Sequence, residues 1–292
     1  MSRFERTYAQ LLKQASSKLE RLGVPNFEQE AWWVLSFAAD WENARLAAEL
    51  PRLAPASAGK KVEEIILQRR GGRPLAYITG ETEFYGLKFK ISPAVLIPRP
   101  ETEVLVEKCV QSLFEKKGKD YPVSILDVGT GSGCIALALL SRLPQARAVA
   151  TDISKEALWV AKKNARSLGL EKRIQFVRGN LLRPLKAPER FDLIVSNPPY
   201  VSPDEFSNLA SSVRNFEPRL ALESPNGGTW FHAQIATQAA RALKSGGLLA
   251  LEVGENQAGE VSEWIRKTDS YQEPTAFIDL FGVVRIVMAE KK

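Results

Sequence analysis

The tetrapeptide Asn197-Pro198-Pro199-Tyr200 is the part of the chain whose residue types and order point most directly to chemistry. It follows an apolar run, DLIVS, which is typical of a buried strand. An amide or arylamine nitrogen is a poor nucleophile because its lone pair is delocalised into the neighbouring π system. Two acceptors that bind its two N–H protons hold such a nitrogen and favour the pyramidal form of the transition state. The tetrapeptide therefore predicts a site that acts on a planar, conjugated nitrogen.

Each residue of the tetrapeptide has an expected role. The side-chain oxygen of Asn197 and the carbonyl oxygen of Pro198 supply the two acceptors. Pro198 and Pro199 fix φ and so hold that carbonyl in place, and Tyr200 offers a flat face for stacking. We therefore expect Asn197, Pro198 and Tyr200 to be catalytic and all four residues to bind the substrate. A Pro-Pro turn that only ends a strand is the alternative, and the two features described next argue against it.

A glycine-rich turn, Gly129-Thr130-Gly131-Ser132-Gly133, lies where another apolar run turns into a helical pattern. Glycines at such a turn permit positive φ and let a ligand approach the backbone closely. A dinucleotide-binding loop would have its third glycine one residue later, and a nucleoside-triphosphate loop would end in Gly-Lys-Ser/Thr. This chain has neither, and its Gly-x-Gly-x-Gly spacing matches the loop of S-adenosylmethionine-dependent methyltransferases. These five residues are the first expected cofactor contacts.

Acidic and amide residues close the next two predicted strands. Asp152 stands 19 residues after Gly133, where an acid accepts both ribose hydroxyl protons of an adenosine bound at the carboxyl ends of the strands. Asn180 is expected to bond the adenine edge beside Leu181, although a residue bonded only to a turn is the alternative. The glycine loop and this acid fit both an NAD enzyme and a methyltransferase. Asn197 is expected to contact the cofactor as well as the substrate.

The tetrapeptide favours methyl transfer over hydride transfer. No general base is needed before the transfer, because the attacked carbon belongs to a cationic sulfonium and the proton leaves afterwards. The chain has one histidine, His232, which lies in a predicted helix over 229–243 and is expected to be structural. Most of the acceleration is expected from holding nitrogen and methyl carbon in line at about 3–3.5 Å.

Length and composition limit the class of protein. The 292 residues suffice for one large α/β domain and a smaller one, and 45% hydrophobic with 25% charged residues argues against extensive disorder. No apolar run approaches the roughly 20 residues that span a bilayer, and the N-terminus lacks a signal-peptide core. We therefore expect a cytoplasmic protein with no membrane partner. Cys109 and Cys134 cannot form a disulfide framework and lack metal-ligand spacing, so no metal is expected.

The charge distribution does not demand a nucleic-acid partner. The net charge is +6, and residues 1–90 contain 14 basic and 11 acidic residues, so half of this surplus lies there. A surplus this small and this evenly divided supplies no basic recognition surface. The clusters Lys60-Lys61 and Arg69-Arg70 fit solvated helix faces or contact with an acidic surface. Direct nucleic-acid binding is therefore not expected.

Residues 1–75 carry no strand signal and are interpreted as a small helical bundle. Apolar spacing predicts helices over 3–22, 27–39, 43–50 and 57–70, the first with an apolar stripe that begins at Phe4. Residues 76–100 shift to aromatic and β-branched types around Gly80 and Gly86, which predicts a β-hairpin linker.

Residues 101–292 alternate predicted strands and helices. This order predicts an α/β fold with a doubly wound, parallel sheet. Nearly continuous apolar strands such as LIVS and LLALEV fit burial on both faces of that sheet. The last two segments, TAFIDL and GVVRIVMAE, are instead expected to form adjacent antiparallel strands.

Over nearly its whole length the chain resembles the HemK family, specifically the bacterial N5-glutamine methyltransferases of peptide chain release factors. The segments that carry the resemblance are RRGGRPLAYITGETEFYGLKF, IPRPETE at 97–103, DVGTGSG, NPPY, and FEPRLAL at 216–222. NPPY also occurs in DNA and RNA amino-methyltransferases, whereas PRPETE is much more specific to the release-factor branch. At 180 and 181 the family commonly has Asp and often an aromatic residue, where this chain has Asn180 and Leu181.

The resemblance implies a class I (Rossmann-like) methyltransferase domain over 101–292, joined by the hairpin 76–100 to a helical substrate-recognition domain over 1–75. The residues implied to hold S-adenosyl-L-methionine are Gly129, Thr130, Gly131, Ser132, Gly133, Asp152, Asn180 and Leu181. The residues implied to bind the glutamine of the Gly-Gly-Gln loop of a class I release factor are Asn197, Pro198, Pro199 and Tyr200. Cys134 has two interpretations: a packed side chain, or a thiol whose pKa is lowered by the N-terminus of its helix.

Three other functions stay open at this point. A nucleic-acid methyltransferase acting on exocyclic amino groups would use the same tetrapeptide, but would be expected to have a strongly basic recognition domain. A sister enzyme acting on a glutamine of a ribosomal protein would look different in the PRPETE segment. A binding module that has lost activity is disfavoured by the intact NPPY and glycine loop.

Overall fold

The computed structural model describes residues 6–118, 120–185, 188 and 190–292. These residues form two compact units. One comprises the chain up to Gly80 together with Ser211–Phe216, and the other comprises Glu81–Ala210 and Glu217–Lys292. Each unit has its own cluster of buried hydrophobic side chains.

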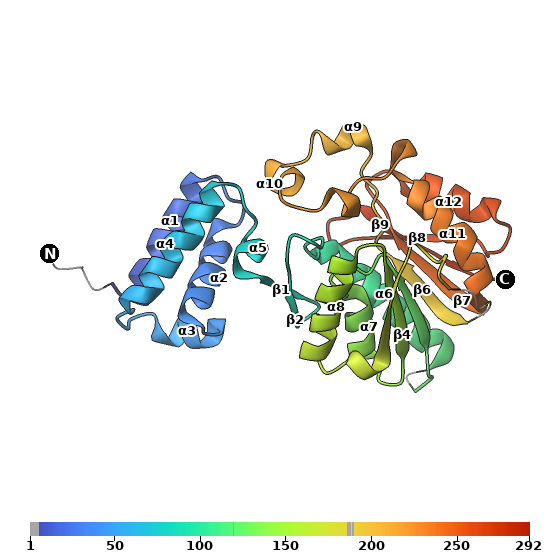
Figure 1. Cartoon of the computed structure of the whole chain (residues 1–292), viewed down its shortest axis with the longest axis horizontal. Helices are drawn as coiled ribbons and strands as arrows, with labels where there is room; N and C mark the ends of the chain where they lie inside the picture. The colour runs from blue at the N-terminus through green and yellow to red at the C-terminus, as the bar shows by residue number, and fades with distance from the viewer. Residues whose placement is uncertain (1–5, 119, 186–187, 189) are drawn as a thin grey trace. The chain divides into compact units, whose positions relative to one another are not determined.

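The first unit is built from helices (Figure 1). They are α1 (Tyr8–Arg21), α2 (Phe27–Ala39), α3 (Asn43–Glu49), α4 (Ala56–Arg70) and α5 (Leu75–Thr79), with α10 (Ser211–Arg214) added from later in the chain. The stripe predicted for the first helix is buried at Tyr8, Leu11, Ala15 and Leu19. Phe4, where we expected that stripe to begin, lies outside the described residues. Thr7 caps α1 through a reciprocal pair of hydrogen bonds with Gln10.

The segment expected to be only a hairpin begins with a short helix. Helix α5 follows Pro74 and ends at Gly80, whose φ of 74° is left-handed. Tyr77 is buried, and apolar neighbours on the same helix pack on the helical core, which explains why this stretch stays helical. The hairpin itself comprises β1 (Glu81–Phe84) and β2 (Leu87–Lys90). Its turn, Tyr85-Gly86, has φ of 53° and 71°, as a type I′ turn requires.

The second unit contains a seven-stranded sheet in the order β5-β4-β3-β6-β7-β9-β8. The strands are β3 (Ser124–Val128), β4 (Arg147–Asp152), β5 (Ile174–Arg178), β6 (Phe191–Ser196), β7 (Leu243–Glu252), β8 (Thr275–Ile278) and β9 (Val284–Glu290). The first five are parallel, while β9 runs antiparallel to both β7 and β8. The predictions of a doubly wound parallel sheet and of two antiparallel final strands are both confirmed.

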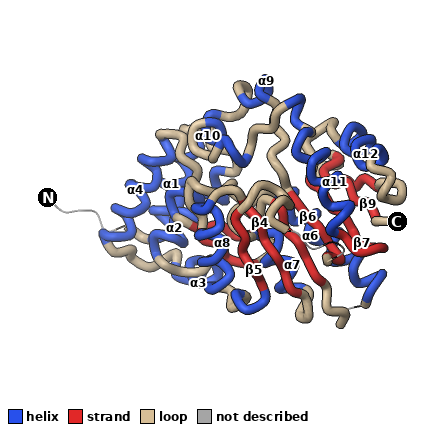
Figure 2. The backbone as a smooth tube through the Cα atoms, turned by 45° about the vertical axis from the view of Figure 1, so that its right-hand side comes forward, coloured by secondary structure: helices blue, strands red, loops and turns tan. Residues whose placement is uncertain are grey.

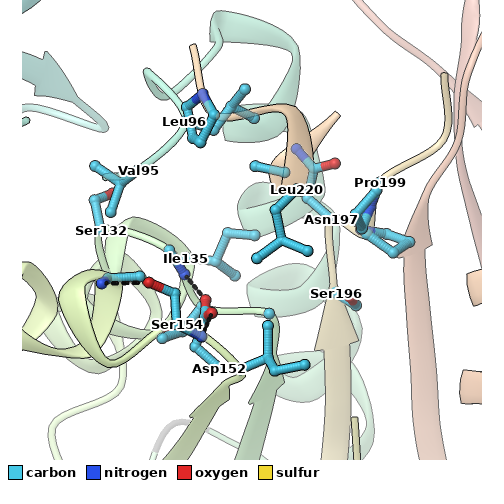
Figure 3. Close-up of a pocket in the computed structure, with 18 of the residues that line it drawn as sticks. Val95, Leu96, Ser132, Ile135, Asp152, Ser154, Ser196, Asn197, Pro199 and Leu220 are labelled. Atoms are coloured by element: carbon cyan, nitrogen blue, oxygen red, sulfur yellow. Dashed lines mark hydrogen bonds between the residues drawn. The ribbon is translucent and has the colours of Figure 1, made fainter. Parts of the chain in front are cut away.

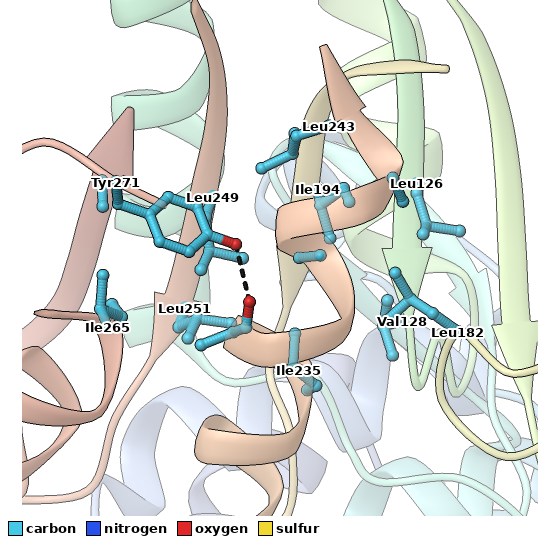
Figure 4. Close-up of a cluster of buried hydrophobic side chains, with 14 of the residues drawn as sticks. Leu126, Val128, Leu182, Ile194, Ile235, Leu243, Leu249, Leu251, Ile265 and Tyr271 are labelled. Carbon is cyan, nitrogen blue, oxygen red and sulfur yellow. Dashed lines mark hydrogen bonds between the residues drawn. The ribbon is translucent and has the colours of Figure 1, made fainter. Parts of the chain in front are cut away.

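Helices cover both faces of this sheet (Figure 2). They are α6 (Pro100–Lys117), α7 (Cys134–Arg142), α8 (Lys155–Ser167), α11 (Trp230–Ala242) and α12 (Ala258–Lys267), with the short α9 (Pro203–Phe206) in the connection after β6. Side chains of α11 and α12 pack with Leu126, Ile194 and Leu249 in one continuous core (Figure 4). Asp127, which alternates with Leu126, instead accepts a hydrogen bond from the N–H of Ala136 in α7. Helices α7 and α11 therefore lie on opposite faces.

The sequence analysis did not predict α9, α10 or α12. Helix α12 was missed although its Val261 and Ile265 are buried at the spacing of one helix face. None of the helices in the described part of the chain is long and apolar enough to cross a membrane.

We expect the interior strand β7, which lies between β6 and β9, to contribute strongly to the stability of the second unit. Leu249 is fully buried in β7, so Leu249→Ala should lower the free energy of unfolding by about 2–5 kcal/mol. Leu280→Ala is the matched control, because this leucine is 85% exposed and its truncation should change the free energy by less than about 0.5 kcal/mol. Equilibrium unfolding in urea measures both, and equal midpoints for the two variants would contradict this assignment of the core.

Candidate active site

A cavity of about 430 Å³ opens at the carboxyl ends of β3, β4 and β6 (Figure 3). Strand β3 pairs with β4 on one side and with β6 on the other. The chain therefore reverses its strand order at this place, which is where open α/β sheets bind ligands. The predicted site residues that line the cavity are Gly129, Thr130, Gly131, Ser132, Asp152, Asn180, Leu181, Asn197, Pro198 and Pro199.

The glycine loop has the backbone conformation that its sequence requires. Gly129, Gly131 and Gly133 all have positive φ, between 56° and 84°. Gly133 ends the loop and is not among the residues that line the cavity, and a methyl group there would be 3.1 Å from Leu137 Cδ1 and 3.2 Å from Ala161 Cβ. This glycine thus permits close packing between helices, whereas the others present their backbone to the cavity.

The buried carboxyl group of Asp127 fixes the glycine loop through hydrogen bonds. Its Oδ2 accepts hydrogen bonds from Thr130 Oγ1 at 2.6 Å and from the N–H of Ala136 at 3.3 Å. Its Oδ1 has no partner among the described residues. Burial raises the pKa of the Asp127 carboxyl to about 7. The sequence analysis did not single out this residue, although an acid that ends an otherwise apolar strand was the available signal.

Asp152 connects the two neighbouring loops. Its Oδ2 accepts from the N–H of Gly131 and its Oδ1 from the N–H of Ser154, both at 2.9 Å (Figure 3). Burial raises the pKa of this carboxyl, and the N–H groups that it accepts from act in the opposite direction. A carboxylate has about four acceptor positions, so two remain for the hydroxyl groups of a ligand.

Leu181 adopts an unusual backbone conformation. Its φ of 52° is left-handed, which is unfavourable for a bulky residue and is concentrated at functional sites. This conformation lets Leu181 line the cavity while it packs against the core. Asn180 lines the cavity beside it and is exposed. Ile153, which the sequence analysis did not single out, also lines the cavity and is 47% exposed.

Three residues of the tetrapeptide, Asn197, Pro198 and Pro199, line the cavity, whereas the fourth, Tyr200, is half-buried outside its lining. The carbonyl oxygen of Tyr200 accepts from Gln257 Nε2 at 2.8 Å. Burial raises the pKa of its phenol, so that the phenol stays protonated.

A further wall of the cavity comes from the segment that precedes α6. Leu96, Arg99 and Thr102 line it, and Arg99 forms an ion pair with the buried carboxylate of Glu217. Glu217 also accepts from the N–H of Ile97 at 3.2 Å. The two segments around 97–103 and 217–221 are thereby tied together, and both line the site.

His232 lies outside the cavity lining and is fully buried in α11. Its Nε2 is 2.8 Å from the carbonyl oxygen of Glu252, so this nitrogen carries the proton and donates it. Burial lowers the pKa of the imidazole to about 4, so the ring is neutral near neutral pH. This environment fits the structural role expected for His232.

Cys134 does not have the lowered pKa that one interpretation of the sequence assigned to it. Burial raises the pKa of its thiol to about 12 and outweighs the hydrogen bonds with Ser132 and with the backbone of Ile135, which act in the opposite direction. Cys134 lines the cavity and is 9% exposed, whereas Cys109 is fully buried, and burial raises the pKa of the Cys109 thiol as well.

Both thiols should therefore be inert in the folded protein. Because the thiolate is the reactive form, we expect an aromatic disulfide reagent at mildly alkaline pH to modify Cys109 and Cys134 at least about a hundredfold more slowly in the native protein than in denaturant. The absorbance of the released thiolate measures both rates. Rapid labelling of native Cys134 would mean that the helix N-terminus, and not burial, controls its pKa.

Family comparisons agree with this geometry. The family model described as the methyltransferase small domain matches residues 102–215, and the PrmC N-terminal domain matches residues 10–80. A release factor glutamine methyltransferase of Moorella thermoacetica is 41% identical over 287 residues, which cover 98% of this chain and 99% of that protein. One from Chlorobaculum tepidum is 46% identical over 66% of this chain and 67% of its own length.

Solved structures share the fold. The hMettl16 catalytic domain in complex with a MAT2A 3'UTR hairpin has a TM-score of 0.55 at 18% identity and covers 80% of each chain. A T. thermophilus 16S rRNA methyltransferase in complex with AdoMet and guanosine has a TM-score of 0.51 at 18% identity, over 73% of this chain and 50% of that one. The sheet and its helices thus form a class I methyltransferase fold. The chain belongs to the family of release factor glutamine methyltransferases.

Proposed function

We propose that this protein transfers a methyl group from S-adenosyl-L-methionine to the side-chain amide nitrogen (N5) of the glutamine in the Gly-Gly-Gln motif of peptide chain release factors. The observation that carries the proposal is the position of Asn197 and Pro198 in the same cavity as the glycine loop and Asp152. The release factor glutamine methyltransferase of Moorella thermoacetica matches nearly the whole chain at 41% identity, whereas the RNA enzymes are 18% identical and share only the fold.

The chemistry of the cavity fits S-adenosyl-L-methionine. Asp152 retains acceptor positions for ribose hydroxyls, and Gly129 and Gly131 leave backbone surface open to a ligand. Leu181 and Ile153 offer apolar side chains to a flat base, and Asn180 offers an amide to its edge. When bound, the cofactor would supply a methyl carbon made electrophilic by its positive sulfur. Buried acids below and beside the cavity are complementary to that charge.

Asn197 and Pro198 would hold the nitrogen that accepts the methyl group. The Asn197 Oδ1 and the Pro198 carbonyl accept the two N–H protons of the glutamine amide, which orients its lone pair towards the methyl carbon. Bound S-adenosyl-L-methionine would supply the methyl group, while Asn197 and Pro198 would hold the amide nitrogen until one of its protons passes to solvent. Catalysis of this kind depends on alignment rather than on a general base. Stacking of Tyr200 on the amide plane stays part of the proposal, and it requires this half-buried side chain to reach a cavity that it does not line in the structure.

Recognition of the release factor is assigned to the helical part of the chain. We propose the boundaries 1–75 for this domain, 76–100 for the linker and 101–292 for the methyltransferase domain. The match of residues 10–80 to the PrmC N-terminal domain supports a separate module. A glutamine side chain alone offers little binding energy, so contacts remote from the chemistry are needed to select it. Trp33, which is 47% exposed on α2, is a suitable anchor because exposed aromatics often dominate protein interfaces.

Two variants should distinguish cofactor binding from catalysis, because one should weaken binding and the other should slow methyl transfer. Asp152→Ala removes acceptors for ribose hydroxyls, each worth roughly 1.5–3 kcal/mol, so the Kd for S-adenosylmethionine should rise at least about tenfold. Asn197→Ala should leave that Kd nearly intact and lower the single-turnover rate by about 10²–10³. Calorimetric titration and quenched-flow methylation measure the two quantities. An unchanged Kd in the first variant, or a rate within a few-fold of wild type in the second, would remove that residue from its proposed role.

The substrate assignment and the domain role are tested with three substrates: intact release factor, the same factor with its Gly-Gly-Gln glutamine replaced, and a short Gly-Gly-Gln peptide. Wild-type enzyme should methylate the intact factor and leave the replaced factor unmodified. Trp33→Ala should raise the KM for the intact factor several-fold and leave methylation of the peptide unchanged, because the peptide lacks the surface of the factor that Trp33 is proposed to contact. Mass spectrometry locates and quantifies the methyl group.

Leu280→Ala provides the matched control, since it truncates a more exposed apolar residue in the other compact unit. Its rates should equal those of wild type on the intact factor and on the short peptide. Methylation of the factor that lacks the glutamine would contradict the substrate, and an unchanged KM in Trp33→Ala would leave Trp33 without a role in recognition.

A further inference from the structure

Behind Asn197 lies a chain of hydrogen bonds that the methyl-transfer scheme does not use. Asn197 Nδ2 is 3.2 Å from Thr102 Oγ1, and Thr102 Oγ1 is 2.6 Å from Glu252 Oε2. Thr102 and Glu252 are each only 2% exposed. Thr102 comes from the first turn of α6 and Glu252 from the end of β7, so the two meet across 150 residues of sequence.

The direction of these hydrogen bonds follows from the groups themselves. An ionised carboxylate only accepts, so Thr102 must give its single hydroxyl proton to Glu252. The Thr102 hydroxyl oxygen can then only accept, so the group of Asn197 that faces it must be a hydrogen-bond donor. That donor is the NH2 group of Asn197, so Oδ1 occupies the other branch of the amide of a residue that lines the cavity. The buried carboxylate of Glu252 thus sets, through Thr102, which end of the Asn197 amide faces Thr102 and which end is left for another partner.

We propose that Thr102 and Glu252 are positioning residues that lock the Asn197 side chain with its Oδ1 presented to the acceptor nitrogen. This inference rests on the proposed function, because it assigns Asn197 Oδ1 to that nitrogen. An asparagine without such a partner can rotate its amide by half a turn and present NH2 instead. In that orientation the NH2 group of Asn197 would face the N–H groups of the substrate amide, and two donors cannot form a hydrogen bond with each other.

We call the hydrogen-bonded chain from Glu252 through Thr102 to Asn197 the relay. Its two positioning residues, Thr102 and Glu252, are fixed by their surroundings. The backbone of Glu252 pairs with Ile286 of β9, and its carbonyl oxygen accepts from His232 Nε2 at 2.8 Å. The N–H of Thr102 donates to the carbonyl oxygen of Arg99 at 3.1 Å as α6 begins. His232 does not line the cavity, but its hydrogen bond to the Glu252 carbonyl helps to fix the end of β7 that carries the Glu252 side chain.

The relay requires Glu252 to be ionised. Burial raises the pKa of this carboxyl to about 7, and its interactions with the Thr102 hydroxyl and with the side-chain amide of Asn197 act in the opposite direction. The other titratable groups around it are Glu101 on α6, Arg285 on β9, Cys134 on α7, Tyr200 after β6 and His232 on α11. A cationic sulfonium in the cavity favours the ionised form further. Protonation at low pH would let Glu252 donate a hydrogen bond to Thr102. The Thr102 hydroxyl could then donate to Asn197, and the orientation of the Asn197 amide would no longer be fixed.

The test compares Thr102→Val, Thr102→Ser and Glu252→Gln in the full chain with intact release factor. Thr102→Val removes the hydroxyl at nearly constant volume and should lower kcat about 10–100-fold, as expected when a reacting group is misplaced. Thr102→Ser should recover most of the rate because it keeps the hydroxyl. Glu252→Gln should lower kcat and flatten its dependence on pH, since the titrating group is gone. The Kd for S-adenosylmethionine should stay within about twofold in all three, in contrast to Asp152→Ala.

A double-mutant cycle separates positioning from a general structural role. If Thr102 acts through Asn197, adding Thr102→Val to Asn197→Ala should cost no further rate, whereas independent effects would multiply. Thr237→Val is the matched control, because this threonine is exposed on α11 and should tolerate the change. Where Thr102→Val does not fold, as judged by its thermal unfolding, Glu252→Gln takes its place in the cycle.

The outcomes are distinguishable from failure of the proposed function. An inactive wild-type enzyme on release factor would overturn the proposed function itself. An active wild type with Thr102→Val equally fast, or with losses that multiply in the double variant, would overturn the relay alone. Three results together would support the positioning role: Thr102→Val lowers the rate, Thr102→Ser recovers it, and Thr102→Val causes no further loss when it is added to Asn197→Ala.

Discussion

The pairing of β3 with β4 on one side and β6 on the other is the constraint on which the site depends. Parallel register aligns Val128 with Thr151 and Asp127 with Val195, so the three strands end at the same edge. The glycine loop and Asn197 directly follow the ends of β3 and β6, and Asp152 is the last residue of β4, so all three are brought to one cavity. Each loop needs to be only a few residues long to do so. A slip of one strand would turn its inward side chains to the other face and separate these groups.

Burial of acids around the cavity is the second property of the site. Asp127 and Glu252 are almost fully buried, and burial raises the pKa of each carboxyl to about 7. Each is held by a threonine hydroxyl, Thr130 or Thr102, at 2.6 Å. Keeping carboxylates in an apolar surrounding is unfavourable unless they are bonded or face a cation. The arrangement therefore favours a ligand that carries positive charge, in agreement with a sulfonium cofactor.

Segments far apart in the sequence share in building the cavity wall. Glu217 accepts from the backbone at Ile97 and pairs with Arg99, so the wall before α6 and the segment after the tetrapeptide hold each other. Thr102, a few residues on, reaches Asn197 and Glu252. One short stretch of chain thus lines the cavity, anchors the opposite wall and orients the residue that is proposed to bind the substrate.

The sequence alone determined the features that rest on local order. Apolar periodicity predicted most helices and strands and the doubly wound sheet, and the motifs predicted the cavity residues Gly131, Asp152 and Asn197. Tertiary structure decided what depends on distant neighbours: Tyr200 outside the cavity lining, the raised pKa of the Cys134 thiol, and the contact of Thr102 with Glu252. The physical reason is that periodicity and turn chemistry act within a few residues. Burial and hydrogen bonding between segments 150 residues apart are fixed only when the sheet closes over its core.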